Sequence, residues 1–280
     1  MNRMSKLTIK STATLSSGKK IPLLGLGVWQ NGSPIPACKA AFDTGYRHID
    51  CAIVYRNEED VGTAVRESSI KREDIFITSK VTSRWHGYNV ALKAIDDSLD
   101  RFKMDYLDLY LIHDPLSRKE KRLETWRALI KRRDDGKLQS IGVSNYGVKH
   151  IEEIKEAGLE TPSVNQIELH PWCQQRPIVE YCEKNNIVIE AYSPLTRGKY
   201  LNDPLLQSFA KKYNKDAAQV LIRYSLQKGW VPLPKSSQPQ RVLTNSQVYD
   251  FELNSNEIKQ LDALDKGKDG ATTWNPVDAP

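Results

Sequence analysis

The sequence predicts an α/β fold built as a single parallel (β/α)8 TIM barrel, with an N-terminal β-hairpin and extra helices near the C-terminus. Three observations lead to this prediction. Apolar runs of strand length alternate with helical segments along the 280 residues. No break in composition, repeat or low-complexity segment divides the chain, so we expect one domain, residues 1–280. Ionisable residues follow several of the strands, as they do in barrels that carry a site on one rim.

The hairpin is predicted at residues 7–22. Two short apolar stretches, 7–15 and 19–22, flank the tripeptide Ser-Ser-Gly, and small polar residues between two such stretches are typical of a tight turn.

The barrel strands are predicted where short runs of apolar, β-branched or aromatic residues recur. We place them at residues 23–28, 46–51, 75–80, 107–113, 140–143, 163–168, 187–192 and 231–234. The first run contains Gly25 and Gly27, which resemble the start of a dinucleotide-binding Rossmann turn. Gln30 occupies the third glycine position of that motif, so we reject the Rossmann alternative.

Helices are predicted between the strands, because apolar residues recur there at helical spacing. Leu92, Ile95 and Leu99 illustrate this within residues 89–102, and glycines follow the ends of several segments. The predicted helices cover residues 34–44, 58–67, 89–102, 120–135, 148–157, 176–185, 217–228, 240–247 and 255–264. We expect residues 265–280 to form a C-terminal tail.

Charge and cysteine content bound the class of protein. The 41 basic residues are interspersed with 35 acidic ones, and the densest basic runs, 118–122 and 131–133, flank a helical pattern. We therefore expect a solvated helix surface and no nucleic-acid partner.

The four cysteines show no CxxC pair, and the N-terminus lacks the apolar core of a signal peptide, so we expect reduced thiols and a cytoplasmic location. No apolar run is long enough for a membrane span, and no ligand cluster indicates a metal.

Four polar residues stand out because each lies at or just after the end of a predicted strand. Asp50, Lys80 and His113 end three of the strands, and Tyr55 follows the first of them in a loop. Strand ends converge on one rim of a barrel, so we expect these side chains to meet, with Trp29 nearby. Singly, each has a structural explanation, such as a barrel-layer residue, an ion pair or a satisfied core histidine. Together they predict a proton-transfer site.

The chemistry follows from the four residue types. A tyrosine has a pKa near ~10 and is a poor acid at neutral pH, so we expect the ammonium of Lys80 to lower the pKa of Tyr55. Asp50 would anchor that ammonium. His113 would donate or accept a hydrogen bond and so orient a carbonyl substrate.

Several motifs, in one order, carry a family resemblance. They are GYRHIDCAIVYRNEEDVGTAVRES, ITSK, LIH, IGVSNY, VNQIELHPW, EAYSPL and PLPKSS, followed by Arg241 and Asn245. The chain resembles the aldo-keto reductase family from the hairpin to the tail, and in particular the fungal or bacterial members that reduce small aldehydes, sugars and dicarbonyls. The resemblance implies NADPH-dependent reduction of a small-molecule carbonyl substrate, with Tyr55 as the proton donor and Asp50, Lys80 and His113 completing a tetrad.

The resemblance also implies cofactor contacts. Ser144, Asn145 and Gln166 would hold the nicotinamide carboxamide, and Tyr192 would stack on its ring. The remaining contacts implied for NADPH or NADP+ are Ser193 and Leu195 in the EAYSPL motif, Lys235, Ser236 and Arg241 at the 2′-phosphate, and Asn245 at the adenine. Many relatives carry glutamate where this chain has Thr244, so one adenine contact differs.

Substrate preference is predicted from two departures. Thr82 and Asp114 stand where many relatives carry tryptophan, while Trp29 remains and Trp85 is expected at the rim. We expect a wide, polar mouth that favours α-dicarbonyls, aldoses and other small or polar carbonyls over steroids. We also expect Asp114 to disfavour anionic substrates by charge repulsion.

Two alternatives remain at this stage. Proteins of this fold also serve as nucleotide-binding regulatory subunits, although here the tetrad is intact. A Schiff-base lyase on the same barrel would use Lys80 as its nucleophile. We expect a monomer.

Overall fold

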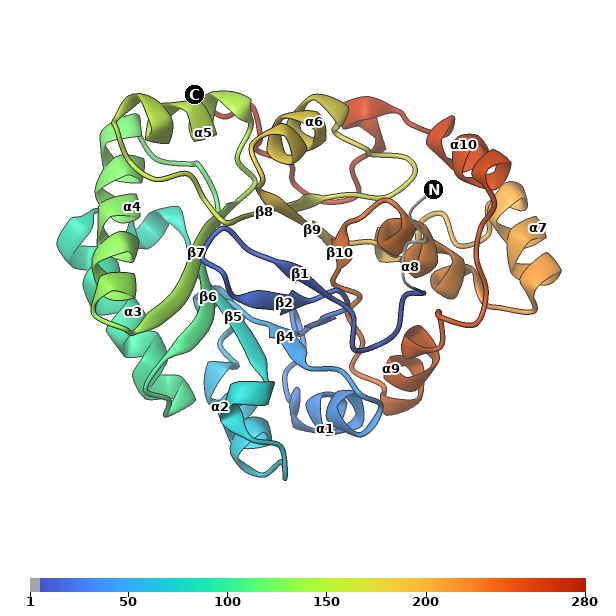
Figure 1. Ribbon diagram of the computed structural model, residues 1–280, viewed down its shortest axis with the longest axis horizontal. Coiled ribbons are helices and arrows are strands. Elements are labelled where there is room, and N and C mark those ends of the chain that lie inside the picture. Colours follow the sequence, from blue (N-terminus) through green and yellow to red (C-terminus); the bar gives the residue numbers. More distant parts are fainter. Residues whose placement is uncertain (1–5) are drawn as a thin grey trace.

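The computed structural model describes residues 6–280, and its centre is a closed barrel of eight parallel strands (Figure 1). The strands pair in the order β10-β9-β8-β7-β6-β5-β4-β3, and a parallel bridge between Gly27 and Lys235 joins the first strand to the segment after the last. The strands are β3 (Leu26–Gly27), β4 (His48–Asp50), β5 (Phe76–Val81), β6 (Leu107–Ile112), β7 (Leu138–Ser144), β8 (Val164–Glu168), β9 (Val188–Tyr192) and β10 (Val231–Pro232). The predicted fold class is confirmed.

The predicted hairpin is also confirmed, although its first strand is shorter than expected. β1 (Thr12–Thr14) and β2 (Lys20–Pro22) pair antiparallel and lie across one end of the barrel (Figure 1). Leu15 and Ile21 are buried there against Phe76, Leu109, Leu111 and Val164. These partners belong to the lower half of the barrel, so the hairpin closes the end opposite to the strand C-termini.

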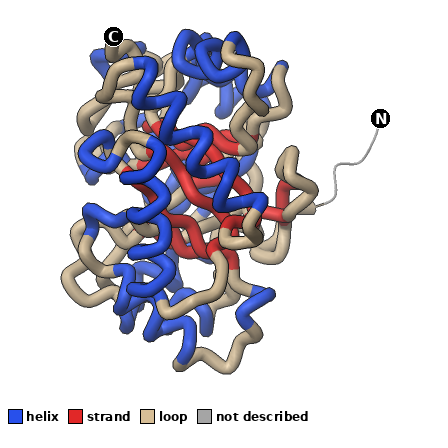
Figure 2. The backbone as a smooth tube through the Cα atoms, turned by 90° about the vertical axis from the view of Figure 1, so that its left-hand side faces the viewer, coloured by secondary structure: helices blue, strands red, loops and turns tan. Residues whose placement is uncertain are grey.

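A ring of helices surrounds the strands (Figure 2). Their buried faces and the outward faces of the strands form the main apolar core. The helices are α1 (Ile35–Asp43), α2 (Glu58–Arg66), α3 (Tyr88–Phe102), α4 (Lys119–Asp134), α5 (Val148–Glu156), α6 (Arg176–Lys184), α7 (Pro204–Tyr213), α8 (Ala217–Gln227), α9 (Pro239–Ser246) and α10 (Ser255–Asp262). Each predicted helix is present to within a few residues.

Among the α-helices of residues 6–280, α7 is the one that the sequence-based prediction missed. Its start carries clear signals, since the Asp203 carboxylate accepts hydrogen bonds from the backbone N–H groups of Leu205 and Leu206 and Pro204 occupies the first turn. Leu206, Phe209 and Ala210 form its buried face.

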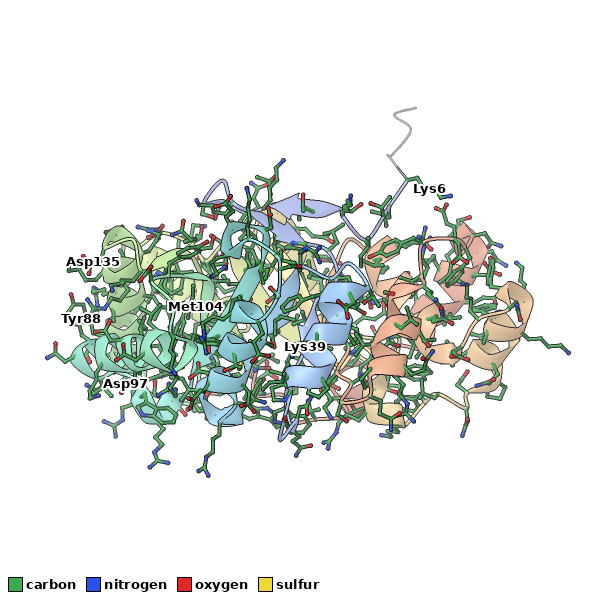
Figure 3. The ribbon with its side chains drawn as sticks, turned by 90° about the horizontal axis from the view of Figure 1, so that it is seen from below. Lys6, Lys39, Tyr88, Asp97, Met104 and Asp135 are labelled. Atoms are coloured by element: carbon green, nitrogen blue, oxygen red, sulfur yellow. The ribbon has the colours of Figure 1, made fainter. Side chains whose placement is uncertain are left out.

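The charged surface of the outer helices is largely paired. On α4, Lys119 contacts Glu156 at 3.2 Å and Lys131 contacts Asp135 at 2.5 Å. Figure 3 shows Lys39, Asp97 and Asp135 projecting outward from this surface. The basic runs therefore lie on a solvated helix face with acidic neighbours, except for Arg122, which is buried and paired with Glu153. In residues 6–280 no helix is long and apolar enough to cross a membrane.

Candidate active site

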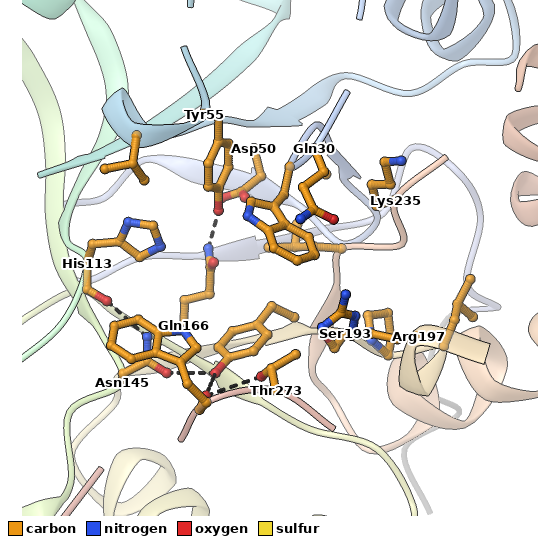
Figure 4. Close-up of a pocket in the computed structure, with 18 of the residues that line it drawn as sticks. Gln30, Asp50, Tyr55, His113, Asn145, Gln166, Ser193, Arg197, Lys235 and Thr273 are labelled. Carbon is orange, nitrogen blue, oxygen red and sulfur yellow. Dashed lines mark hydrogen bonds between the residues drawn. The ribbon is translucent and has the colours of Figure 1, made fainter. Parts of the chain in front are cut away.

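A cavity of about 510 Å³ opens where the strands end, opposite the hairpin (Figure 4). Many of the residues predicted from the sequence line it. They are Trp29, Asp50, Tyr55, Thr82, His113, Asn145, Gln166, Tyr192, Ser193, Leu195 and Lys235. Strand direction explains the convergence, because parallel strands deliver their C-terminal residues to one rim.

Asp50 and Lys80 form a buried ion pair directly below the cavity. The Lys80 Nζ atom donates hydrogen bonds to Asp50 Oδ1 at 2.6 Å and to the Cys51 carbonyl at 2.8 Å. Lys80 is 0% exposed. Burial alone would lower the pKa of Lys80, but the negative charge of Asp50 raises it above its usual value. The side chain is therefore a fixed cation.

Tyr55 lies above this pair because a short 3₁₀ turn, Ile53–Tyr55, follows β4 and bends the chain back over the strand end. The Lys80 Nζ atom is 5.2 Å from the centre of the Tyr55 ring. Burial raises the pKa of Tyr55 to about 12, although Lys80 by itself lowers it. The expectation of a pKa below the ordinary value is therefore wrong for the free protein, because burial outweighs the attraction of the ammonium. Tyr55 is fully protonated at neutral pH.

His113 completes the group. Its ring centre lies 5.8 Å from that of Tyr55, with the two planes at 76°. Burial, followed by the nearby Lys80, holds the pKa of His113 well below its usual range, so the imidazole is neutral. Its Nδ1 atom has no hydrogen-bond partner within the described chain.

Asn145, Gln166 and Tyr192 line the wall of the cavity beside His113, and Ser144 supports them. The Tyr192 hydroxyl donates to Asn145 Oδ1 at 2.8 Å, and Asn145 Nδ2 donates to the His113 carbonyl at 2.9 Å. Ser144 Oγ donates to the backbone carbonyl of Gln166 at 2.8 Å. Asn145 has a φ of 59°, a left-handed conformation that asparagine tolerates. The hydrogen bonds fix the amide and phenol groups on one side of the cavity.

Lys235 and Arg197 both line the cavity on the side away from His113 (Figure 4). Ser236 Oγ accepts a hydrogen bond from the Gln238 N–H at 3.0 Å in the turn that leads into α9. Arg241 is exposed on the first turn of α9, and Asn245 is 6% exposed on the same helix. Ser236, Arg241 and Asn245 lie outside the cavity lining. The structure thus places two cations, Lys235 and Arg241, around the start of α9, an arrangement that suits an anion.

Two of the residues predicted to contact substrate are not on the cavity wall. Asp114 is 2% exposed, and its carboxylate accepts hydrogen bonds from the backbone N–H groups of Ser83 at 3.2 Å and Leu116 at 3.0 Å. It braces two loops, so the expected repulsion of anionic substrates loses its basis. Trp85 packs against the main apolar core and does not line the cavity. Trp29 and Thr82 line the cavity as expected.

The C-terminal tail adds residues that sequence reasoning missed. Thr273 and Trp274 line the cavity, and the tail is held by the buried carboxylate of Glu168 at the end of β8. Glu168 accepts four hydrogen bonds from the N–H and hydroxyl groups of Thr272 and Thr273. Burial raises the pKa of Glu168, but these bonds and one from His170 outweigh burial and bring it to about 2. The ionised carboxylate therefore anchors one wall of the mouth.

Arg197 is a further unpredicted cavity residue. It follows β9 with a φ of 51°, and its guanidinium lies 5.0 Å from the centre of the Trp29 ring. A cation over an indole face is a favourable contact. The EAYSPL motif ends two residues before Arg197, so the motif alone gave no signal for it.

Comparison with known proteins agrees with this geometry. A model of the Aldo/keto reductase family matches residues 23–266. The chain is 45% identical to glyoxal reductase of Bacillus subtilis over 262 residues, which cover 92% of this chain and 94% of that protein. It is 42% identical over 261 residues to the 9,11-endoperoxide prostaglandin H2 reductase of Trypanosoma cruzi, covering 91% and 92% of the two chains. The crystal structure of an aldo/keto reductase from Brucella melitensis superimposes with a TM-score of 0.87 at 45% identity, over 91% of this chain and 99% of that one.

Proposed function

The chain belongs to the aldo/keto reductase family, and from that premise we propose that it reduces small carbonyl compounds to alcohols with NADPH, using Tyr55 as the general acid. One observation supports this most strongly. A protonated phenol, a buried ammonium–carboxylate pair and a neutral imidazole meet at the base of one cavity.

In the proposed mechanism, NADPH supplies the hydride when bound. The neutral imidazole of His113 orients the carbonyl oxygen by a hydrogen bond. As negative charge develops on that oxygen, the Tyr55 hydroxyl donates its proton to it. Lys80 stabilises the resulting phenolate by its charge, and Asp50 holds the ammonium in place.

The residues present fit such a cofactor. Gln166 lines the cavity with an Oε1 atom that has no partner in residues 6–280, and Asn145 offers a second amide beside it. We propose that these two residues and Ser144 bind the carboxamide, that Tyr192 stacks on the ring, and that Ser193 and Leu195 contact the diphosphate linkage. Lys235, Ser236 and Arg241 would bind the 2′-phosphate, and Asn245 the adenine.

The proposed substrates are small aldehydes and α-dicarbonyls. Trp29 and Trp274 give the mouth two indole walls, and Thr82 supplies a hydroxyl. This mouth is more aromatic than the sequence suggested, because the tail adds Trp274 and Asp114 points elsewhere. The similarity to a protein named glyoxal reductase supports the dicarbonyl class.

A substrate panel tests the proposal. When purified protein and NADPH are mixed with α-dicarbonyls or small aldehydes, the NADPH absorbance at 340 nm should fall. It should fall more slowly with bulky steroid ketones. No oxidation of NADPH with any carbonyl would refute the function. Borohydride with a carbonyl substrate should trap no adduct on Lys80, because this ammonium is fully buried and paired, which also argues against the Schiff-base lyase.

We expect Arg241→Ala to weaken NADPH binding by roughly 10- to 100-fold, since a charge-assisted hydrogen bond to phosphate contributes about 1.5–3 kcal/mol. NADH lacks the 2′-phosphate, so its dissociation constant should hardly change. Fluorescence titration with both cofactors measures this, with Lys211→Ala on α7 as a control that removes an exposed cation elsewhere. Equal losses for NADPH and NADH would show that Arg241 acts on the helix and not on the phosphate.

We also propose a cytoplasmic, monomeric enzyme. All four cysteines, Cys38, Cys51, Cys173 and Cys182, are buried free thiols, as expected in a reducing compartment. Asp50, Tyr55, Lys80 and His113 all come from this chain, so the proposed proton transfer uses no residue of a second copy.

A further inference from the structure

A second carboxyl group lies beneath the cavity, on the strand next to Gln166. Glu190 on β9 points into the barrel and is 0% exposed. Its Oε2 atom accepts a hydrogen bond from Gln166 Nε2 at 2.8 Å, and the same nitrogen donates to Asp50 Oδ2 at 2.9 Å. Both N–H bonds of the Gln166 amide are therefore directed downward, one to each carboxyl group. The side-chain oxygen of Gln166, Oε1, is left for the cavity.

Within residues 6–280, no lysine or arginine forms an ion pair with Glu190. His48 on β4 approaches it, with Nε2 at 3.5 Å from Glu190 Oε1 and 3.1 Å from the Thr78 hydroxyl. Burial lowers the pKa of His48 to about 3, so this imidazole is neutral. On the other side, β10 places apolar Val231 beside Glu190. The remaining charged neighbours are Asp50 on β4 and Lys80 on β5, which already pair with each other.

Glu190 can change its charge near neutral pH. Burial, and then the negative charge of Asp50, raise the pKa of Glu190 to about 8, although Gln166 and Lys80 lower it in part. The carboxyl group is therefore mainly protonated below this value and ionised above it. Its Oε2 atom accepts the Gln166 hydrogen bond in either state. The Oε1 atom faces the neutral imidazole and accepts no hydrogen bond from residues 6–280, so it is the oxygen that is free to take up the proton.

We propose that Glu190 is a positioning residue for the cofactor, which holds Gln166 in place and makes the relative affinity for NADP+ and NADPH depend on pH. This rests on the proposed function, because it assigns the nicotinamide carboxamide to Gln166. It adds a role for a residue that lies outside the tetrad and outside the cavity lining.

The coupling between Glu190 and the cofactor is electrostatic. Only the oxidised nicotinamide ring carries a positive charge. An ionised Glu190, joined to the carboxamide site through one amide, attracts that ring in a region that solvent screens poorly. By linkage, the oxidised cofactor favours the ionised carboxylate to the same degree. The ratio of the dissociation constants, NADP+ over NADPH, should therefore fall as the pH rises, by about fivefold between pH 7 and pH 9 and by at most about tenfold in total for a coupling of one pKa unit.

Cofactor binding measures this without turnover. NADP+ and NADPH are titrated separately against the protein between pH 6.5 and 9.5, with intrinsic tryptophan fluorescence as the readout. The 2′-phosphate is common to both cofactors, so its own titration cancels from the ratio. Glu190→Gln keeps a neutral side chain of the same shape and should give a ratio that does not change with pH and equals the low-pH value of the unmodified protein. Glu257→Gln, a buried carboxylate on α10, serves as the control and should retain the pH dependence.

Two results overturn the inference. A ratio that is constant with pH in the unmodified protein excludes it, even when Glu190→Gln fails to fold. A Glu190→Gln variant with the pH dependence of the unmodified protein assigns the effect to another group. If neither cofactor binds to the unmodified protein, the proposed function fails as well. If both bind and carbonyls are reduced while the ratio stays flat, only the role of Glu190 fails.

Discussion

Tyr55→Phe is expected to lower the turnover number for carbonyl reduction by about 100-fold or more, the usual range for a positioned general acid. The substitution removes one hydroxyl group and keeps the ring, so the ion pair beneath it and the cavity wall stay in place. NADPH affinity should remain within a factor of about two, because the loss falls on the transition state and not on cofactor binding.

The pH dependence sharpens this test. The pKa of Tyr55 is about 12, so the phenol stays protonated across the ordinary assay range. The loss in Tyr55→Phe should therefore be similar at pH 6 and pH 9. Steady-state rates with an α-dicarbonyl measure it, and Tyr88→Phe, on the exposed outer face of α3, is the matched control. Turnover close to that of the unmodified protein would remove Tyr55 from the acid role.

The sequence predicted the tetrad because a simple rule of barrel geometry applies to it. Asp50 and Lys80 stand at the ends of neighbouring strands, so pairing follows once the strands are parallel. The barrel itself followed from alternating patterns that each involve only local residues. Helix α7 showed that such patterns are missed when a turn-like Asp-Pro sequence precedes them.

Features that depend on side-chain direction or long-range contacts were not predictable. Asp114 turned toward two backbone N–H groups, which no periodicity reports. Trp274 reaches the cavity because Glu168 binds the tail more than a hundred positions later in the chain. The pKa of Tyr55 required the depth of burial, and the strand pattern showed Glu190 only as one residue of an apolar run.

Lys80→Met is expected to have two effects: it should lower the turnover number by about 100-fold or more, and it should destabilise the fold. Without the ammonium, nothing offsets the rise in the pKa of Tyr55 that burial causes, so proton donation becomes harder. The Asp50 carboxylate also loses its partner while it stays buried, and breaking one side of a buried pair costs about 3–5 kcal/mol of unfolding free energy. Urea unfolding measures the stability, with Lys93→Met, from an exposed pair on α3, as the control that should change little.

The double substitution Asp50→Asn with Lys80→Met separates the two roles of Lys80. It leaves no unpaired charge at this position, and the asparagine can still accept the hydrogen bond from Gln166. Stability should therefore recover most of the loss seen in Lys80→Met. Turnover should not recover, because the phenolate of Tyr55 still has no cation beside it. If activity returned together with stability, Lys80 would serve the fold alone, and the proton transfer assigned to Tyr55 would need no ammonium.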